Sequence, residues 1–417
     1  MSNIIRNDRM FVSINEAQEM ILSAASAESV NTTFLLLGEP GIAKTAIAMD
    51  VARIASAQDG IERRLVYIDC PTADIADLGV PVPDPDTKTT RLYPNELFGF
   101  HEMGPDADGY TGVPGVIVLD EFSKGALPVQ NMLHPLLNPV GGYRRLGAQI
   151  LHPKTIVILT GNLGSDGVGD NIKAHTRNRV TEIHVRKATV EEFLAYAMGA
   201  GINPMLGAWL SQDPRPFRSY LDPGAEDYDA ETLMMIHNPT AKSANKNMAV
   251  CTPRSLMMAS DILNAAEGSG LSEKLIEAQL IGTIGAAATR VFMAFRSIGQ
   301  HLPSPAQIVA DPLGTPVPEN IAAQIILGFK APAWMTQGVG GLPVPKSRMD
   351  VVARIDAYFK YIARMVPEQQ AVFVNCVKHA KDNAEKQNKT TDMSKLWGVM
   401  ITTKSFQQWA IDNSFMF

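Results

Sequence analysis

Cysteine is scarce in this chain of 417 residues, which contains three, at Cys70, Cys251 and Cys376. Three widely separated cysteines cannot build a disulfide framework, and their spacing is not that of a zinc knuckle. The eight histidines are also isolated, since none is spaced with cysteines or acids as a metal-ligand pair would be. This scarcity argues against a disulfide-stapled secreted domain and predicts a reducing, cytoplasmic location.

Long apolar runs are lacking as well. The longest uncharged stretch lies between Glu192 and Asp213, and its glycines and Pro204 predict two helices joined by a turn instead of a membrane span. Residues 1–10 are polar and have no apolar core, so they do not resemble a secretory signal. The net charge of −6 argues against a protein that coats nucleic acid or a membrane surface.

Apolar segments suited to strands alternate with helical patterns in the first part of the chain. Strands are expected at residues 32–37, 65–68, 116–119, 155–159 and 181–185. Ser13 and Glu16 form a capping box, which predicts that a helix starts there and continues to about Ala27. Continuous apolar strands separated by helices predict a parallel sheet that is covered on both faces.

Strand patterns end at about residue 187. Helices are expected after this point at residues 190–198, 253–266, 272–296, 350–366 and 368–381. Proline- and glycine-rich stretches at residues 303–318 and 331–345 interrupt the helical pattern. We therefore expect three parts, which are an α/β core over residues 1–186, a helical domain over residues 187–300 and a helical extension over residues 301–417.

The segment after the first of these strands has the composition of a phosphate-binding loop. The residues expected to hold the nucleotide there are Gly38, Glu39, Pro40, Gly41, Ile42, Ala43, Lys44, Thr45 and Ala46. In such a loop, backbone N–H groups and the positive end of the following helix hold phosphate oxygens. Lys44 would reach the β- and γ-phosphates of ATP, and Thr45 would hold Mg²⁺ through its hydroxyl. An ordinary strand-to-helix turn is the alternative.

Ala43 departs from the usual pattern of this loop, which has glycine immediately before the lysine. A β-carbon is costly wherever the backbone needs a positive φ angle. We therefore expect Ala43 to weaken nucleotide affinity, provided that the loop adopts its usual conformation.

Polar side chains end two further strands. Asp120 and Glu121 follow the strand at 116–119, and Asn162 follows the strand at 155–159. Ligands bind at the carboxyl ends of parallel strands, so we expect Asp120 to position Mg²⁺ and Glu121 to act as general base for the attacking water. Asn162 would bond to that water or to the γ-phosphate. The alternatives are solvent-facing acids and an asparagine that only forms a turn.

The glycine-containing loop, the acidic pair and the strand-end asparagine together resemble the AAA+ ATPases. The resemblance implies an α/β P-loop AAA+ core with a parallel sheet, followed by an all-α lid and here by a helical C-terminal extension. It also implies that Arg179, or Arg177 as the second candidate, is the arginine finger, which reaches the γ-phosphate bound to the neighbouring subunit. Arg254 matches the arginine that the family carries in its lid, near the nucleotide.

Within the AAA+ proteins the detail is similar to the MoxR-like ATPases. The segment from Asp77 to Pro81 resembles the one after their second strand, and the helix with Gln130 resembles the one after their acidic pair. The resemblance places the insert of this group, which faces the pore of the ring, at residues 84–112. It places a hairpin at residues 140–151, before the strand that ends in Asn162.

Side chains in these two inserts are candidates for contact with a substrate. In the first insert they are apolar, namely Leu92, Tyr93, Leu97 and Phe98, with packing inside the insert as the alternative. In the second they are Arg144 and Arg145, which could touch a substrate, nucleic acid or the next subunit. The alternative for the two arginines is a hairpin tip that contacts only solvent.

The resemblance implies an ATPase that needs ATP and Mg²⁺ and that self-associates into a ring, expected to be a hexamer. The ring would remodel or activate a client protein, and related proteins commonly work with a partner that carries a von Willebrand A domain. Two other functions stay open, a nucleic-acid motor or loader and a slow nucleotide-dependent switch. Arg144 and Arg145 are the local support for nucleic acid, and the acidic net charge disfavours it.

Overall fold

The computed structural model describes residues 4–6, 9–100, 109–139, 141, 143–163, 174–239, 248–386 and 390–414. The chain divides into two compact units, Met1–Lys187 with Asn238–Lys246, and Ala188–His237 with Asn247–Phe417. Among the described residues, no helix combines the length and the apolar character that crossing a bilayer requires.

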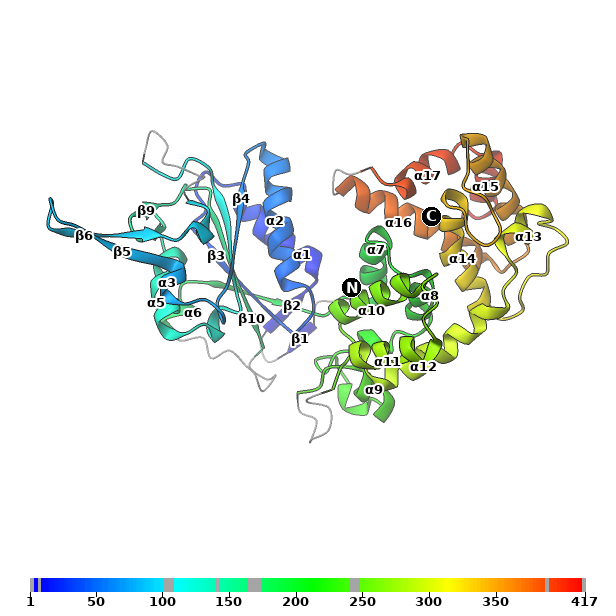
Figure 1. Ribbon diagram of the computed structural model, residues 1–417, viewed down its shortest axis with the longest axis horizontal. Coiled ribbons are helices and arrows are strands. Elements are labelled where there is room, and N and C mark those ends of the chain that lie inside the picture. Colours follow the sequence, from blue (N-terminus) through cyan, green and yellow to red (C-terminus); the bar gives the residue numbers. More distant parts are fainter. Residues whose placement is uncertain are drawn as a thin grey trace. The chain divides into compact units, whose positions relative to one another are not determined.

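The first unit contains a seven-stranded sheet in the order β1-β2-β11-β3-β10-β7-β4 (Figure 1). Its strands are β1 (Ile4–Arg6), β2 (Arg9–Val12), β3 (Thr33–Gly38), β4 (Arg64–Asp69), β7 (Gly115–Asp120), β10 (Ile156–Asn162) and β11 (Thr181–Val185). β1 is antiparallel to β2, whereas the other six strands run parallel. The five predicted strands and the parallel sheet are confirmed. β1 and β2 were not predicted, because they are short and lie in a segment with polar residues.

Helices cover both faces of this sheet. α1 (Ile14–Ala25) and α2 (Lys44–Asp59) lie on one side, and α3 (Ile75–Leu78), α5 (Leu127–Leu137) and α6 (Ala174–Arg177) lie on the other (Figure 1). The predicted capping box of α1 is present, since the Ser13 hydroxyl accepts from the Glu16 N–H and the Glu16 carboxylate accepts from the Ser13 N–H. Apolar residues of α1 and α2 pack against β3, β7, β10 and β11 in one buried cluster.

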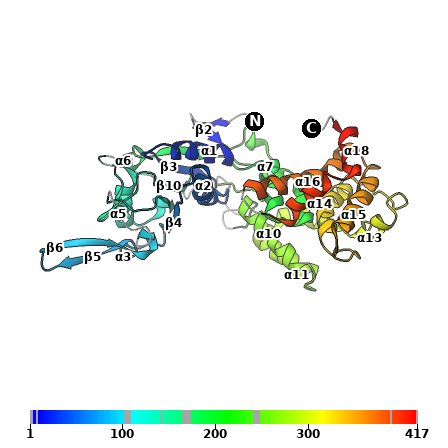
Figure 2. The ribbon, with the colours of Figure 1, turned by 90° about the horizontal axis from the view of Figure 1, so that it is seen from above.

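Two small antiparallel hairpins are attached to the sheet. β5 (Gly79–Asp84) pairs with β6 (Thr89–Pro94), and β8 (Arg145–Leu146) pairs with β9 (Gln149–Ile150). The β5–β6 hairpin extends away from the sheet of the first unit, as Figure 2 shows. A short 3₁₀ helix, Glu96–Phe98, follows β6. The β8–β9 pair confirms the hairpin predicted within residues 140–151.

The second unit is built from helices, so the predicted change from α/β to helical structure is confirmed. They are α7 (Val190–Gly199), α8 (Pro204–Gln212), α9 (Ala230–Met235), α10 (Pro253–Ala266), α11 (Glu273–Ile284), α12 (Ala286–Ile298), α13 (Pro305–Ala310), α14 (Ile321–Thr336), α15 (Arg348–Ile362), α16 (Pro367–Lys386), α17 (Asp392–Met400) and α18 (Lys404–Asp412). α14 was not predicted, because Pro332 lies inside it and proline usually ends a helix.

The single helix predicted over residues 272–296 is wrong. The structure has two helices there, α11 and α12, with Gly285 between them. Gly285 has a φ of 86°, and a β-carbon there would lie 2.2 Å from the Ala249 carbonyl oxygen. Only glycine fits this backbone conformation and this close approach.

The second unit has a core that spans the boundary expected near residue 300. α14 packs against α8, and α16 packs against α7, so helices on both sides of that boundary share one unit. Towards the C-terminus, Tyr358, Phe359, Phe373 and Trp409 are buried in one aromatic cluster. Residues 187–300 and 301–417 therefore do not form two separate compact units.

Candidate functional site

The loop between β3 and α2 adopts a conformation suited to hold an anion. Gly41 has a φ of 74° and Ala43 a φ of 77°, and α2 begins directly afterwards at Lys44. A β-carbon on Gly38 would lie 2.5 Å from Ile42 Cδ1 and 2.6 Å from the Val185 carbonyl oxygen. Left-handed residues before a helix turn backbone N–H groups towards one point, where the helix dipole also favours negative charge. The loop therefore fits a phosphate group.

The other loop residues differ in their accessibility to solvent. Glu39 and Ile42 are buried, Pro40 is half-buried and Ala46 lies exposed in the first turn of α2. The Lys44 ammonium donates to the carbonyl oxygens of Gly38, at 2.9 Å, and Glu39, at 2.7 Å. Its own loop thus holds Lys44 at the edge of the sheet, where the ammonium group would neutralise the charge of a phosphate.

Asp120, at the end of β7, is surrounded by hydroxyl groups. Its Oδ1 accepts from Thr45 Oγ1 at 2.9 Å and from Thr160 Oγ1 at 2.5 Å, and its Oδ2 accepts from Tyr67 Oη at 2.8 Å. A carboxylate beside a threonine hydroxyl at the start of the helix provides the hard oxygen donors that Mg²⁺ prefers. The residues present therefore fit a magnesium ion.

Asn162 joins the loop to the acidic pair. Its Oδ1 accepts from Lys44 Nζ at 3.1 Å, and its Nδ2 lies 3.5 Å from Glu121 Oε1, which is long for a hydrogen bond. The other carboxylate oxygen of Glu121 forms an ion pair with Lys124 Nζ at 2.6 Å. Glu121 itself has a φ of 46°, and its N–H donates to Thr160 Oγ1 at 3.0 Å. These contacts aim the Glu121 carboxylate at the same edge of the sheet as Lys44.

Strand register explains why these residues meet. Asn162 is the direct neighbour of Gly38 across β10 and β3, and Asp120 is the neighbour of Asp69 across β7 and β4. The carboxyl ends of parallel strands share one edge, so residues far apart in sequence gather there. The site also contains Tyr67, which sequence patterns did not reveal.

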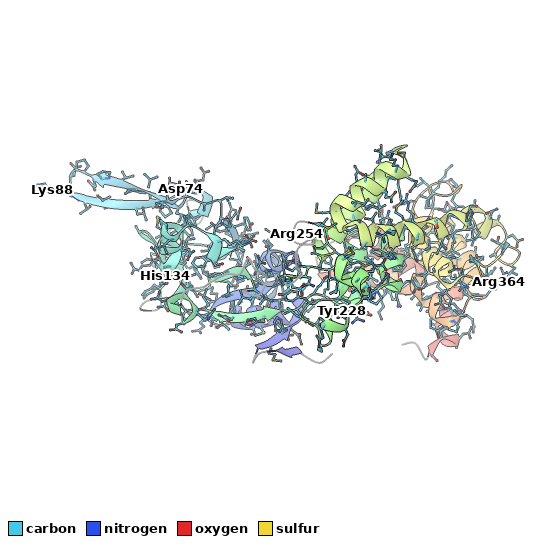
Figure 3. The ribbon with its side chains drawn as sticks, turned by 90° about the horizontal axis from the view of Figure 1, so that it is seen from below. Asp74, Lys88, His134, Tyr228, Arg254 and Arg364 are labelled. Carbon is cyan, nitrogen blue, oxygen red and sulfur yellow. The ribbon has the colours of Figure 1, made fainter. Side chains whose placement is uncertain are left out.

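The two candidate finger arginines have partners within their own chain. Arg179 Nη1 lies 2.7 Å from His134 Nδ1 and also contacts His134 Nε2, and Figure 3 labels this histidine. Arg177 is half exposed and forms an ion pair with Glu182 at 2.9 Å. The contacts described above around Lys44 and Asp120 include neither the Arg179 nor the Arg177 guanidinium.

Arg254 lies on the second unit, in the first turn of α10, directly after Pro253 (Figure 3). Its side chain is exposed. The predicted helix start is confirmed, because Thr252 and Ser255 form a capping box there. An exposed arginine at the positive end of a helix would be stabilised by an anion.

Arg144 is not available for a substrate, which corrects one of the expectations above. It is buried, and its guanidinium donates to Thr33 Oγ1 at 2.6 Å and to the carbonyl oxygens of Thr32, at 3.0 Å, Val30, at 3.2 Å, and Leu136. Burial lowers the pKa of Arg144 to about 10. Arg144 therefore stabilises the fold, whereas its neighbour Arg145 is exposed.

Phe98 is also no pore contact, because it is buried against Phe100, with 5.4 Å between ring centroids. Tyr93 on β6 is 53% exposed, and Leu92 is half-buried beside Gly147. Of the apolar candidates in this insert, Tyr93 is thus the one with an accessible ring, while the side chain of Leu97 lies outside the described residues.

A comparison with protein families found a match within the first unit. Residues 33–180 match the family model of the AAA domain, dynein-related subfamily. These residues are therefore similar to an AAA domain, and the match covers less than half of the chain. The match runs from β3 to the residue before β11 and so contains the loop, the acidic pair and Asn162. The first unit accordingly has the α/β fold of a P-loop AAA+ core, as the sequence predicted.

Solved structures similar to the chain are remote. NtrX from Brucella abortus in complex with ADP shares 14% identity over 90% of this chain and 68% of that chain, with a TM-score of 0.33. Hsp104 in its closed state, with ATPγS and FITC casein, shares 15% over 61% and 45%, with a TM-score of 0.28. No curated protein matches the chain. The assignment of the AAA domain therefore rests on the family model and on the sheet, not on these structures.

Proposed function

We propose that this protein is an AAA+ ATPase of the MoxR-like type, which hydrolyses ATP with Mg²⁺ to ADP and phosphate. The observation that carries the proposal is the joining of Lys44, Asn162 and Glu121 at one sheet edge, beside Thr45 and Asp120. A phosphate loop, a magnesium site and a carboxylate base occur together there. This combination is what hydrolysis of a phosphoanhydride requires.

Each of these side chains has a definite part in the proposal. Bound Mg²⁺ would neutralise charge on the phosphates, and Thr45 and Asp120 would hold it. Lys44 would exchange its two carbonyl acceptors for phosphate oxygens. Glu121 would take a proton from the attacking water, and Asn162 would orient that water or the γ-phosphate. Lys124 pairs with Glu121 Oε2 in this structure, so Oε1, on the side of Asn162, would take the proton.

Glu121→Gln tests the hydrolytic step. The amide cannot accept a proton, so the variant should bind ATP in Mg²⁺ with unchanged affinity and release no phosphate. Glu19→Gln is the matched control, because Glu19 is an exposed carboxylate on α1 of the same unit. Phosphate release by Glu121→Gln at the wild-type rate would show that a different group is the base.

The ring and its trans-acting finger belong to the same proposal. We assign the finger to Arg179, with Arg177 as the alternative, and we expect a hexamer. Arg179→Ala should then bind ATP and not hydrolyse it, and mixing it with Glu121→Gln should restore activity at interfaces where one chain supplies Glu121 and the next supplies Arg179. Mixtures that stay inactive, or a monomer with full activity, would refute a finger supplied by a neighbour. Thermal denaturation of Arg179→Ala measures whether loss of the His134 contact destabilises the protein, separately from any effect on hydrolysis.

The ring would use ATP to remodel or activate a client protein, with a von Willebrand A domain protein as the expected kind of partner. We assign Arg254 to the nucleotide, because an anion would stabilise its exposed guanidinium at the helix start. The burial of Arg144 leaves Arg145 as the local support for a nucleic-acid motor. Cys70, Cys251 and Cys376 are buried thiols that form no disulfide among the described residues, which suits a reducing cytoplasm.

A further inference from the structure

Asp120 has an unusual neighbour in Tyr67, whose side chain comes from the strand at the edge of the sheet. β4 is the last strand in the sheet order, and Tyr67 is paired with Val118 of β7. Side chains two residues apart share one face of a strand, so Tyr67 lies diagonally beside Asp120 on that face. Its hydroxyl donates to Asp120 Oδ2 at 2.8 Å.

Packing alone does not explain a tyrosine at this position. Tyr67 is 36% exposed and Leu65, on the same face of β4, is 41% exposed, whereas Val66 and Ile68 on the other face are buried. An exposed ring at a sheet edge adds little to the core. The contribution that is specific to Tyr67 is therefore its hydroxyl group.

The hydroxyl completes a set of three that holds the Asp120 carboxylate. Thr45 from α2 and Thr160 from β10 both donate to Oδ1, while Tyr67 donates to Oδ2 from the opposite side. The terminal torsion of an aspartate is soft, so donors on one oxygen alone leave the other free to swing. Donors on both oxygens fix the plane of the carboxylate.

We propose that Tyr67 is a positioning residue, whose hydroxyl orients the Asp120 carboxylate for magnesium. The inference rests on the proposed function, because it assumes that Asp120 and Thr45 hold the ion. Groups that orient a metal-binding carboxylate act on metal affinity more than on the affinity of the nucleotide alone. Tyr67→Phe keeps the ring and removes the one hydroxyl, so it isolates this effect.

The test measures binding of a fluorescent ADP analogue twice, in EDTA and in excess Mg²⁺, for wild type, Tyr67→Phe and Tyr196→Phe. The last variant is the control, since Tyr196 is exposed on α7 of the second unit. We expect Tyr67→Phe to keep its nucleotide affinity in EDTA. The gain in affinity on adding Mg²⁺ should be about fivefold smaller than in wild type, which is less than the roughly 10- to 100-fold typical of such groups because Tyr67 is partly exposed. The Mg²⁺ concentration for half-maximal ATP hydrolysis should rise by about the same factor.

Two results would overturn the inference. The gain in affinity with Mg²⁺ could be as large in Tyr67→Phe as in wild type; this includes an equal fall in EDTA and in Mg²⁺, which would indicate a general effect on folding. Tyr196→Phe could also show the same loss. A wild-type protein that binds no nucleotide in either buffer would instead refute the proposed function, and the role of Tyr67 with it.

Discussion

Replacing Ala43 with glycine tests the backbone of the phosphate loop, because Ala43 has a φ of 77° in the left-handed region. A residue with a β-carbon loses about 1–2 kcal/mol in that conformation. Glycine avoids this cost. It also loses more backbone freedom on folding, which lowers the free energy of unfolding by about 0.5–1 kcal/mol. Ala43→Gly should therefore raise the free energy of unfolding by about 0.5 kcal/mol.

Ala46→Gly is the matched control, three residues further along the chain. Ala46 is exposed in the first turn of α2, where glycine should lower the free energy of unfolding by about 1 kcal/mol. Both variants change alanine to glycine, so the contribution of the unfolded chain is nearly the same. The two variants should therefore differ by about 1.5 kcal/mol, and the sign of each change should be opposite.

Urea denaturation followed by circular dichroism and by tryptophan fluorescence measures the two changes. The tryptophans are Trp209, Trp334, Trp397 and Trp409, which all belong to the second unit. Fluorescence therefore reports the second unit, and a shift that appears in circular dichroism alone belongs to the first unit. If Ala43→Gly is destabilised as much as Ala46→Gly, the loop does not hold Ala43 in the left-handed conformation in solution.

The same variant also refines the expectation that Ala43 weakens nucleotide binding. Where the free loop already holds the left-handed conformation of Ala43, the cost of that conformation falls on folding and not on binding. The dissociation constant of ADP should then change by less than about twofold in Ala43→Gly. A much larger gain in affinity would mean that the free loop relaxes away from the binding conformation.

Three further predictions concern Arg144, Lys44 and Asp59, the last residue of α2. Arg144→Met should lower the free energy of unfolding by about 3 kcal/mol, since it leaves buried carbonyl oxygens without a donor, whereas Arg145→Met should change it by less than about 0.5 kcal/mol in the same denaturation experiment. Lys44→Ala should abolish ATP binding in equilibrium titration, and retained affinity would refute the phosphate-loop assignment. The Arg63 side chain, by its hydrogen bond, lowers the pKa of Asp59 from 3.8 to about 2. Asp59→Asn should therefore cost about 1 kcal/mol at neutral pH, and the difference from wild type should close as pH falls from 3.8 towards 2, as acid denaturation series would show.

The edge of the sheet could be predicted from the sequence because its chemistry follows from strand ends. Gly38, Asp120 and Asn162 each end an apolar run, and parallel strands bring such ends together. A sequence pattern therefore located the loop, the acidic pair and the asparagine without knowledge of their contacts.

Residues inside strands could not be located in this way. Tyr67 and Thr160 each lie two residues before the end of a strand, where a tyrosine or threonine is an ordinary strand former. Their hydroxyls matter because of neighbours on other strands, which only register determines. Arg144 shows the same limit. The sequence of a hairpin does not reveal that its arginine will be buried and will donate to carbonyl oxygens far away in the chain.

The buried Arg144 also constrains how the first unit can assemble. Its acceptors on Val30 and Thr32 lie more than a hundred residues earlier in the chain, with a separation of 114 for Val30. Contacts over such distances form late, because closing a long loop costs entropy before any contact rewards it. Until the hairpin docks, both the guanidinium and these carbonyl oxygens stay hydrated. Docking of the hairpin with the wrong register would bury a charge without acceptors, so this arginine favours the correctly assembled domain over misfolded alternatives.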